Sequence, residues 1–338
     1  MNLLNKLRNF NNSLIVHHWD SDGICSAVLL KILLNKKEVN NLTPKIGQYM
    51  LSIEAINDLG TTFDSIIILD LCLTKDNIFE LKRETGSEIT IFDHHLQEKF
   101  SGINHVNPVS EGESTEKWPS TTWVIYKLLD LKLSLPIVLG VIGDKEEKIR
   151  ENEEIYYEIT NYLNHQGSNL EDILYIVELI DSNYRLMDAS AVQSAVKEIL
   201  MSGEDLQNLQ RNKNWKKNLE QLRMEEKRIE GQTKLEKNGI LLYKFSTKYD
   251  VISKLARDFV WRKRKRLVVL VNLPPNKDSA QIYCRGNSKL LNSKKLIELA
   301  RKRGYSAGGK EDVVGIILPK KDEEIFINEI FDSFGWLK

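Results

Sequence analysis

The chain has 338 residues, of which 41% are hydrophobic and 28% are charged. This composition is typical of a soluble globular protein, and the length allows two domains with cores of their own. No stretch approaches the roughly 18 uninterrupted apolar residues of a membrane span, and the N-terminus lacks the apolar core of an export signal. The three cysteines, Cys25, Cys72 and Cys284, are odd in number and far apart, which argues against a disulfide framework. We therefore expect a protein of the reducing cytoplasm without membrane partners.

The formal net charge is zero, but the charge is unevenly distributed along the chain. Residues 239–338 contain 21 Lys and Arg against 11 Asp and Glu, a net of +10, so residues 1–238 carry a net of −10. A basic C-terminal part is a candidate surface for a polyanion. The acidic N-terminal part is a poor candidate surface for a polyanion, unless metal ions neutralise its acidic side chains. The alternative is that the uneven distribution of surface charge has no functional role.

The first 145 residues alternate between strand and helix patterns. Short β-branched runs predict strands over 13–18, 65–71 and 88–95, and helical patterns cover 23–36, 75–83 and 119–131. This alternation predicts βαβ units and a parallel sheet. The runs are apolar on consecutive residues, as expected for strands that are buried on both faces.

The pattern becomes helical over 151–237, and its charged last part, 204–237, indicates a solvated helix that connects two domains. A mixed pattern then returns. Strands are predicted over 240–245, 266–273, 279–285 and 312–318, and helices over 251–265, 292–304 and 321–334. The sequence therefore predicts an α/β protein with a parallel-sheet domain (1–165), a helical linker (166–238) and a smaller α/β domain (239–338).

Acidic and imidazole side chains follow each predicted N-terminal strand. The first strand leads into His18, Asp20 and Asp22, the second into Asp70, and the third into Asp93, His94 and His95. A fourth apolar stretch, 136–144, ends in the same way at Asp144. Because the carboxyl ends of parallel strands converge at one edge of the sheet, we expect these side chains to meet at a single site.

This mixture of carboxylates and imidazoles suits Mn²⁺, Fe²⁺ or Zn²⁺, whereas Mg²⁺ prefers oxygen ligands alone. Four aspartates and two or three histidines are too many for one ion, and they fit two ions that share a bridging carboxylate. Asp22 and Asp144 could each instead be only a helix N-cap. His17 is expected to face away from His18 and to pack in the core, because strand side chains alternate.

Four segments in this order and spacing, HHWDSDGICSA, IIILDL, IFDHH and GVIGD, resemble the four motifs of the DHH phosphoesterase superfamily. VNP and PSTTWVIYKLL resemble the segments that follow its signature, and residues 239–338 resemble the DHH-associated domain, with Arg285 on a strand and a glycine loop before the last strand. H-x-D-x-D-G and NYRLMD are similar to RecJ-like single-strand nucleases of the archaeal type. The resemblance covers nearly the whole chain.

The resemblance implies two divalent metal ions, with Mn²⁺ preferred and Mg²⁺ as the second choice. One ion would take Asp20, Asp70 and His18, and the other Asp22, Asp70, His94 and Asp144. Two further residues would have catalytic roles. Asp93 would orient the histidines as a hydrogen-bond acceptor, and His95 would contact the scissile phosphate.

The second domain would bind the substrate through Arg285, Gly308, Gly309 and Lys310. Where the family has the sequence GGGH, this chain has Ala307-Gly308-Gly309-Lys310, so a lysine point charge replaces an imidazole. The basic run 261–266 could follow a nucleic-acid strand, with Trp261 stacking on a base, but a solvated helix end is the favoured interpretation. Trp19 could stack on a base near the metals or could belong to the core.

The favoured function is a Mn²⁺-dependent single-strand exonuclease that releases nucleoside 5′-monophosphates from DNA or RNA, in the 5′ to 3′ direction by family resemblance, in repair or replication. One alternative is a phosphodiesterase that acts on oligoribonucleotides or cyclic dinucleotides. Another is a non-catalytic scaffold associated with a helicase, although such relatives tend to lose metal ligands that this chain keeps. The expected partners are single-stranded nucleic acid and, by resemblance, a HerA-type helicase or replication and repair proteins.

Overall fold

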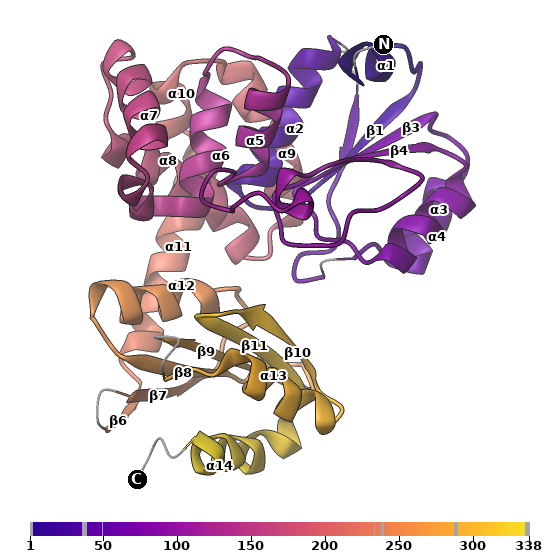
Figure 1. The fold of residues 1–338 in the computed structure, drawn as a ribbon. Helices are drawn as coiled ribbons and strands as arrows, with labels where there is room; N and C mark the ends of the chain where they lie inside the picture. Colours follow the sequence, from indigo (N-terminus) through magenta and orange to yellow (C-terminus); the bar gives the residue numbers. More distant parts are fainter. Residues whose placement is uncertain are drawn as a thin grey trace. The chain divides into compact units, whose positions relative to one another are not determined.

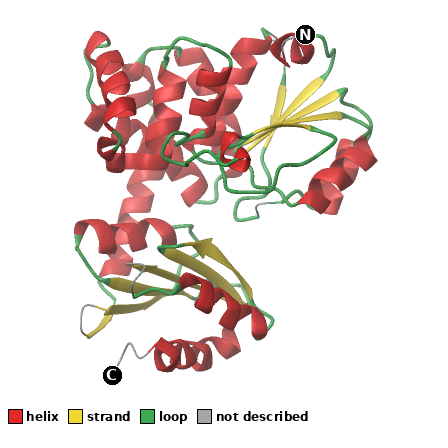
Figure 2. Cartoon of the chain, in the orientation of Figure 1, coloured by secondary structure: helices red, strands yellow, loops and turns green. Residues whose placement is uncertain are grey.

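The computed structural model of the protein describes residues 3–35, 39–48, 50–232, 234–237, 240–286 and 290–334. The chain divides into two compact units, Met1–Leu219 and Glu220–Lys338. Each unit contains helices and strands (Figure 2), as an α/β protein should. The predicted domain boundary between residues 238 and 239 lies outside the described residues.

The first unit contains a five-stranded parallel sheet with the strand order β2-β1-β3-β4-β5. The strands are Ser13–His17 (β1), Asn40–Leu42 (β2), Ser65–Leu69 (β3), Glu88–Phe92 (β4) and Asn104–Val106 (β5). The three central strands confirm the predicted parallel sheet. The edge strands β2 and β5 were not predicted, because each has only three residues, rich in Asn, which rarely favours strands.

Helices cover both faces of this sheet (Figure 1). Alternate residues of its strands belong to two separate cores. Ile15 and Ile67 pack toward α2 (Ser21–Leu34), α5 (Thr121–Leu128) and α6 (Leu135–Lys145), whereas Leu14 and Ile66 pack toward α3 (Ile53–Leu59) and α4 (Lys75–Thr85). The central strands are therefore buried on both faces, which explains their unbroken apolar runs.

Most of the predicted helical linker packs in the first unit. Its helices are α7 (Glu153–His165), α8 (Leu170–Arg185), α9 (Ala189–Ser202), α10 (Leu206–Gln210) and α11 (Lys213–Glu230). Ile173, Val196 and Trp215 belong to the same core as α2. Residues 204–237 are not one solvated helix: α10 and α11 are separate, and Lys234–Lys237 is a strand, β6, because it pairs with the next strand.

The second unit is a six-stranded mixed sheet with the strand order β10-β11-β9-β8-β7-β6, in which only β7 and β8 are parallel. The other strands are Ile240–Phe245 (β7), Leu267–Asn272 (β8), Ser279–Gly286 (β9), Ser306–Lys310 (β10) and Val313–Pro319 (β11). Its helices are α12 (Ile252–Arg257), α13 (Ser293–Lys302) and α14 (Glu323–Phe334). All four predicted strands are present, but the predicted glycine loop is the edge strand β10 of a hairpin.

None of the helices in the described part of the chain combines the length and the apolar character that a bilayer span requires.

Candidate metal centre

The carboxyl ends of three adjacent strands supply most of a dense cluster of side chains. His18 follows β1, Asp70 follows β3 and Asp93 follows β4. Asp144 also reaches the cluster, but it comes from the last turn of α6 and not from a strand-like segment. The apolar run that precedes Asp144 is long because α6 is a helix buried on nearly all sides, and such a helix has no polar face to interrupt the run.

Asp70 lies at the centre of the cluster and is only 2% exposed. Its Oδ2 atom lies 3.5 Å from His18 Nδ1, and its Oδ1 atom lies 3.5 Å from His94 Nε2 and accepts a hydrogen bond from Thr121 Oγ1 at 3.2 Å. Its backbone has a φ of +58°. Asp tolerates this left-handed conformation better than most residues do. The strained backbone thus presents one carboxylate to two histidines from different strands.

The first group of candidate ligands surrounds His18. Its Nδ1 atom lies 2.8 Å from Asp20 Oδ2, and the ligand atoms of His18, Asp20 and Asp70 all lie within 4.8 Å of one another. Burial alone would lower the pKa of His18, but the Asp20 and Asp70 carboxylates together outweigh burial and raise it well above 6.5. Asp20 also caps α2, because its Oδ1 atom accepts a hydrogen bond from Gly23 N.

The second group consists of Asp22, His94 and Asp144, whose ligand atoms also lie within 4.8 Å of one another. His94 Nε2 is 3.0 Å from Asp144 Oδ2. Both oxygens of Asp22 accept hydrogen bonds from the first backbone amides of α5, Thr121 N at 2.7 Å and Thr122 N at 3.0 Å. Burial and the charges of Asp70 and Asp144 raise the pKa of Asp22 well above its usual range.

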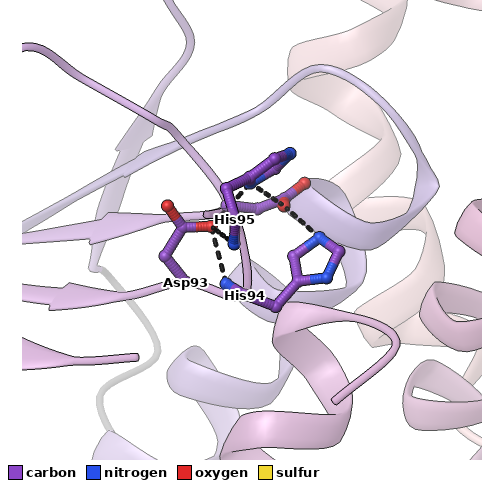
Figure 3. A group of neighbouring side chains, drawn as sticks. Asp93, His94 and His95 are labelled. Carbon is purple, nitrogen blue, oxygen red and sulfur yellow. Dashed lines mark hydrogen bonds and ion pairs between the residues drawn. The ribbon is translucent and has the colours of Figure 1, made fainter. Parts of the chain in front are cut away.

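Asp93 has a different environment, because its Oδ1 atom is occupied by donors of His94 and His95 (Figure 3). Oδ1 accepts from the backbone amide of His94 at 2.7 Å and lies 2.7 Å from the Nδ1 atom of His95, and Oδ2 accepts from Gln97. Burial alone would raise the pKa of Asp93, but His95 and His94 outweigh it and lower the pKa to about 2. Asp93 therefore holds the imidazole of His95, whose side chain is 32% exposed.

The cluster has the chemistry of a metal site. His94 Nε2 is buried and makes no hydrogen bond, although two carboxylates lie within 3.5 Å of it. Buried carboxylates are costly when no cation compensates their charge, and here several share one site. Imidazole and carboxylate donors together suit Mn²⁺ or Zn²⁺. Asp70 lies 3.5 Å from His18 of the first group and 3.5 Å from His94 of the second, and its ligand atom also lies within 4.8 Å of those of Asp93, His94 and His95. The residues therefore fit two divalent ions with Asp70 as a shared ligand.

The predicted substrate-binding residues all lie in the second unit. Arg285 is at the end of β9, where it donates to Asp312 Oδ2 through Nε and Nη2, and its Cζ atom lies 4.9 Å from the centroid of the Trp261 ring. Gly308 is exposed, and a Cβ atom there would meet nothing within 4 Å. At Gly309 a Cβ atom would lie 2.0 Å from Val313 O, so that glycine is required by the hairpin. The side chain of Lys310 lies outside the described part of the structure.

Two further predictions concern aromatic and basic residues. Trp19 is 2% exposed and belongs to the core of the first unit, so it does not stack on a base. In the basic run, Lys263 pairs with Glu230 at 2.8 Å and Lys265 pairs with Glu236 at 2.6 Å. The run begins in the short π-helical turn Asp258–Arg262 and continues beyond its end, which agrees with the favoured interpretation of a solvated helix end.

Several supporting residues were not identified from the sequence. Thr121 and Thr122 bind Asp22 through the backbone, and Gln97 binds Asp93. The glycines of GVIGD are a sequence feature from which this close packing could have been inferred. A Cβ atom at Gly140 would lie 2.6 Å from Asp22 Oδ1, so the close approach of α6 requires glycine at that position.

Comparisons with known proteins agree with this architecture. Residues 12–163 match the model of the DHH family, N-terminal domain. A crystal structure of exonuclease RecJ bound to manganese has a TM-score of 0.68 at 16% identity, covering 99% of this chain and 93% of that chain. The structure of RecJ from Thermus thermophilus in complex with Mn²⁺ has a TM-score of 0.69 at 16% identity, covering 99% of this chain and 54% of that chain. No curated protein matches the chain.

A third similar structure is a pGpG-specific phosphodiesterase from Vibrio cholerae, with a TM-score of 0.52 at 13% identity over 96% of this chain and 99% of that chain. At such identities the solved structures establish the fold. This chain shares with them the parallel sheet and the mixed-sheet domain that follows it, and its cluster of carboxylates and imidazoles lies at the edge of that parallel sheet. Residues 12–163 therefore match the DHH family, N-terminal domain, and the fold of the chain is similar to that of RecJ.

Proposed function

We propose that this protein is a phosphoesterase of the DHH type and acts as a metal-dependent single-strand exonuclease that releases nucleoside 5′-monophosphates. The observation that carries the proposal is the position of Asp70 between two groups of candidate ligands, at 3.5 Å from both His18 and His94. One ion would be held by His18, Asp20 and Asp70, and the other by Asp22, Asp70, His94 and Asp144. Two ions held by these residues would supply Lewis-acid chemistry for the phosphoryl oxygen and would lower the pKa of a bound water.

The protein contributes the orientation of the groups around that reaction. In this proposal His95 contacts the scissile phosphate, since its side chain is the most exposed imidazole of the cluster at 32% and Asp93 fixes its ring. Asn107 donates to the backbone carbonyl of His95 at 2.8 Å and so holds the same segment from the other side. The mixed nitrogen and oxygen ligands favour Mn²⁺ over Mg²⁺.

The second unit would bind the strand through Arg285, Gly308, Gly309 and Lys310. A guanidinium has five N–H donors, and Asp312 accepts from only two of its nitrogens, which leaves donors for a phosphate. Trp261 packs against the same guanidinium and restricts its orientation. The exposed backbone at Gly308 would allow a phosphate to approach closely.

A second candidate function is hydrolysis of short substrates, which the similarity to a pGpG-specific phosphodiesterase supports. The replacement of the family histidine by Lys310 argues against this function, because a short substrate depends more strongly on that one contact. A non-catalytic scaffold is the third candidate, and the complete set of ligands around Asp70 argues against it. A HerA-type helicase and proteins of DNA repair or replication are the proposed partners.

The deciding experiment uses end-labelled single strands of two, five and about thirty nucleotides, as DNA and as RNA, with Mn²⁺ or Mg²⁺. We expect mononucleotide products from the long strands, with more product in Mn²⁺. Labels at the 5′ and the 3′ end distinguish the direction, which is proposed as 5′ to 3′. Cleavage of the dinucleotides alone would favour the second candidate, and no cleavage of any length would favour the scaffold.

A further inference from the structure

The segment that carries Asp20 and Asp22 is hydrogen-bonded to α8, a helix far along the chain, through the buried carboxylate of Asp181. Ser21 lies between these two candidate ligands and is the first residue of α2, so its backbone amide has no acceptor within the helix. Asp181 of α8 accepts from Ser21 N at 3.0 Å and from Ser21 Oγ at 2.6 Å, both through Oδ1. These contacts fix the backbone and the side chain of Ser21 through a single atom.

Arg185, one turn further along α8, completes the arrangement. Its Nη2 atom donates to Asp181 Oδ2 at 3.2 Å, and the side chains of both residues are only 5% exposed. A neutral acceptor, such as an amide or hydroxyl oxygen, could make the same hydrogen bonds to Ser21. The Asp181 carboxylate, in contrast, adds a negative charge close to Asp20. A carboxylate is tolerated here because Arg185 compensates it, and the pair connects Ser21 firmly to α8.

We propose that Asp181 is a positioning residue that sets the spacing between Asp20 and Asp22. Asp20 belongs to the group around His18, and Asp22 belongs to the group with His94. Asp181 thus acts on both groups at once through the one residue between them. This inference rests on the proposed function, because it assumes that the two groups bind divalent ions. It predicts that loss of Asp181 weakens the binding of both ions.

A matched control separates this role from a general contribution to folding. Asp172 lies on the same helix, where it accepts from Asn169 N and Ser168 Oγ in the cap of α8. Asp172→Ala therefore removes a hydrogen-bonded carboxylate from α8 without any contact with the metal cluster. It should lower the thermal stability and leave the Mn²⁺ affinity unchanged.

The experiment compares wild type with Ser21→Ala, Asp181→Asn, Asp181→Ala and the control variant Asp172→Ala. Mn²⁺ binding is measured on the full chain by calorimetry and by electron paramagnetic resonance, and unfolding is followed in chelator. We expect Asp181→Ala to weaken Mn²⁺ binding about 10- to 100-fold, as is typical for residues that support metal ligands. Ser21→Ala and Asp181→Asn should weaken it less, and the resonance of the bound Mn²⁺ should change in each variant.

The double variant Ser21→Ala/Asp181→Ala should bind Mn²⁺ no more weakly than Asp181→Ala alone, because the two residues act through one contact. If Asp181→Ala does not fold, Ser21→Ala and Asp181→Asn decide the question. Wild-type affinity and resonance in the folded Asp181 and Ser21 variants would overturn the inference and leave the proposed function standing. A wild-type protein that binds no Mn²⁺ would instead overturn the proposed function and, with it, this inference.

Discussion

The two units use charge in opposite ways. In the first unit, carboxylates and imidazoles are concentrated at one buried edge of a parallel sheet, and Asp22, Asp70 and Asp93 are each held by specific donors. In the second unit, the positive charge is distributed over the surface, and part of it is already neutralised by ion pairs such as Lys263–Glu230. The first arrangement concentrates candidate metal ligands at one place, whereas the second spreads positive charge over many exposed positions.

This difference determines how each unit should respond to mutation. A buried ligand cluster works only when its geometry is complete, so one substitution there should remove the activity. A basic surface acts through the sum of many weak contacts, so single substitutions there should have graded effects that depend on salt. The predictions below test this contrast, from the largest expected effect to the smallest.

Substitution of Asp70 should have the largest effect. Asp70→Ala, or Asp70→Asn, which better tolerates the left-handed backbone, removes the carboxylate that both ligand groups approach. We expect the rate to fall well beyond the about 10- to 100-fold loss that is typical of supporting residues, together with a loss of bound Mn²⁺. Asp76→Ala, at an exposed position in the same unit, is the control. A near wild-type rate in either Asp70 variant would contradict the two-metal assignment.

His95→Gln should separate catalysis from metal binding. The side chain of His95 is partly exposed and is held by Asp93, so its loss should lower kcat by about 100-fold or more without a change in Mn²⁺ content. Steady-state kinetics and metal analysis on the same preparation measure the two effects. His165→Gln, which changes an exposed histidine, is the control. If Mn²⁺ content fell in parallel with the rate, His95 would be a metal ligand instead.

Mn²⁺ should stabilise the first unit selectively. Binding to the folded cluster contributes about 2.7 kcal/mol per site when free metal is 100 times the dissociation constant. Hydrogen exchange should therefore slow in β1, β3 and β4 when Mn²⁺ replaces chelator, and β8 and β9 should be unaffected. Equal protection of both units would show that the metal effect is not confined to the cluster.

The smallest effect should come from the second unit. Arg285→Ala combined with Lys310→Ala should weaken the binding of single strands. The plot of log binding constant against log salt concentration should also become less steep, by a slope of about 0.7 for each of the one or two phosphate contacts that are lost. Lys263→Ala with Lys265→Ala is the matched control, because these lysines already pair with Glu230 and Glu236. Filter binding over a salt series measures both variants. An unchanged slope after loss of Arg285 and Lys310 would remove this unit from substrate binding.

Much of this architecture can be predicted from local sequence patterns. The unbroken apolar runs identify the buried strands β1, β3 and β4, and the polar residues directly after them identify the candidate ligands. The edge strands β2 and β5 could not be identified, since three-residue segments form strands only by pairing with a neighbour. The sequence predicts a loop for the glycine segment 306–310, but the segment is a strand because it pairs with β11.

The sequence by itself determined which residue types follow each strand, and parallel pairing then placed them at one edge of the sheet. Only the tertiary structure decided how they are held. The support of Asp22 comes from the amide groups of α5, and Asp144 reaches the cluster from a helix that packs closely at Gly140. The partner of Arg285, Asp312, likewise depends on how two strands pair. Sequence patterns record the preferences of each segment, whereas contacts between segments distant in the chain depend on packing, which leaves little local signal.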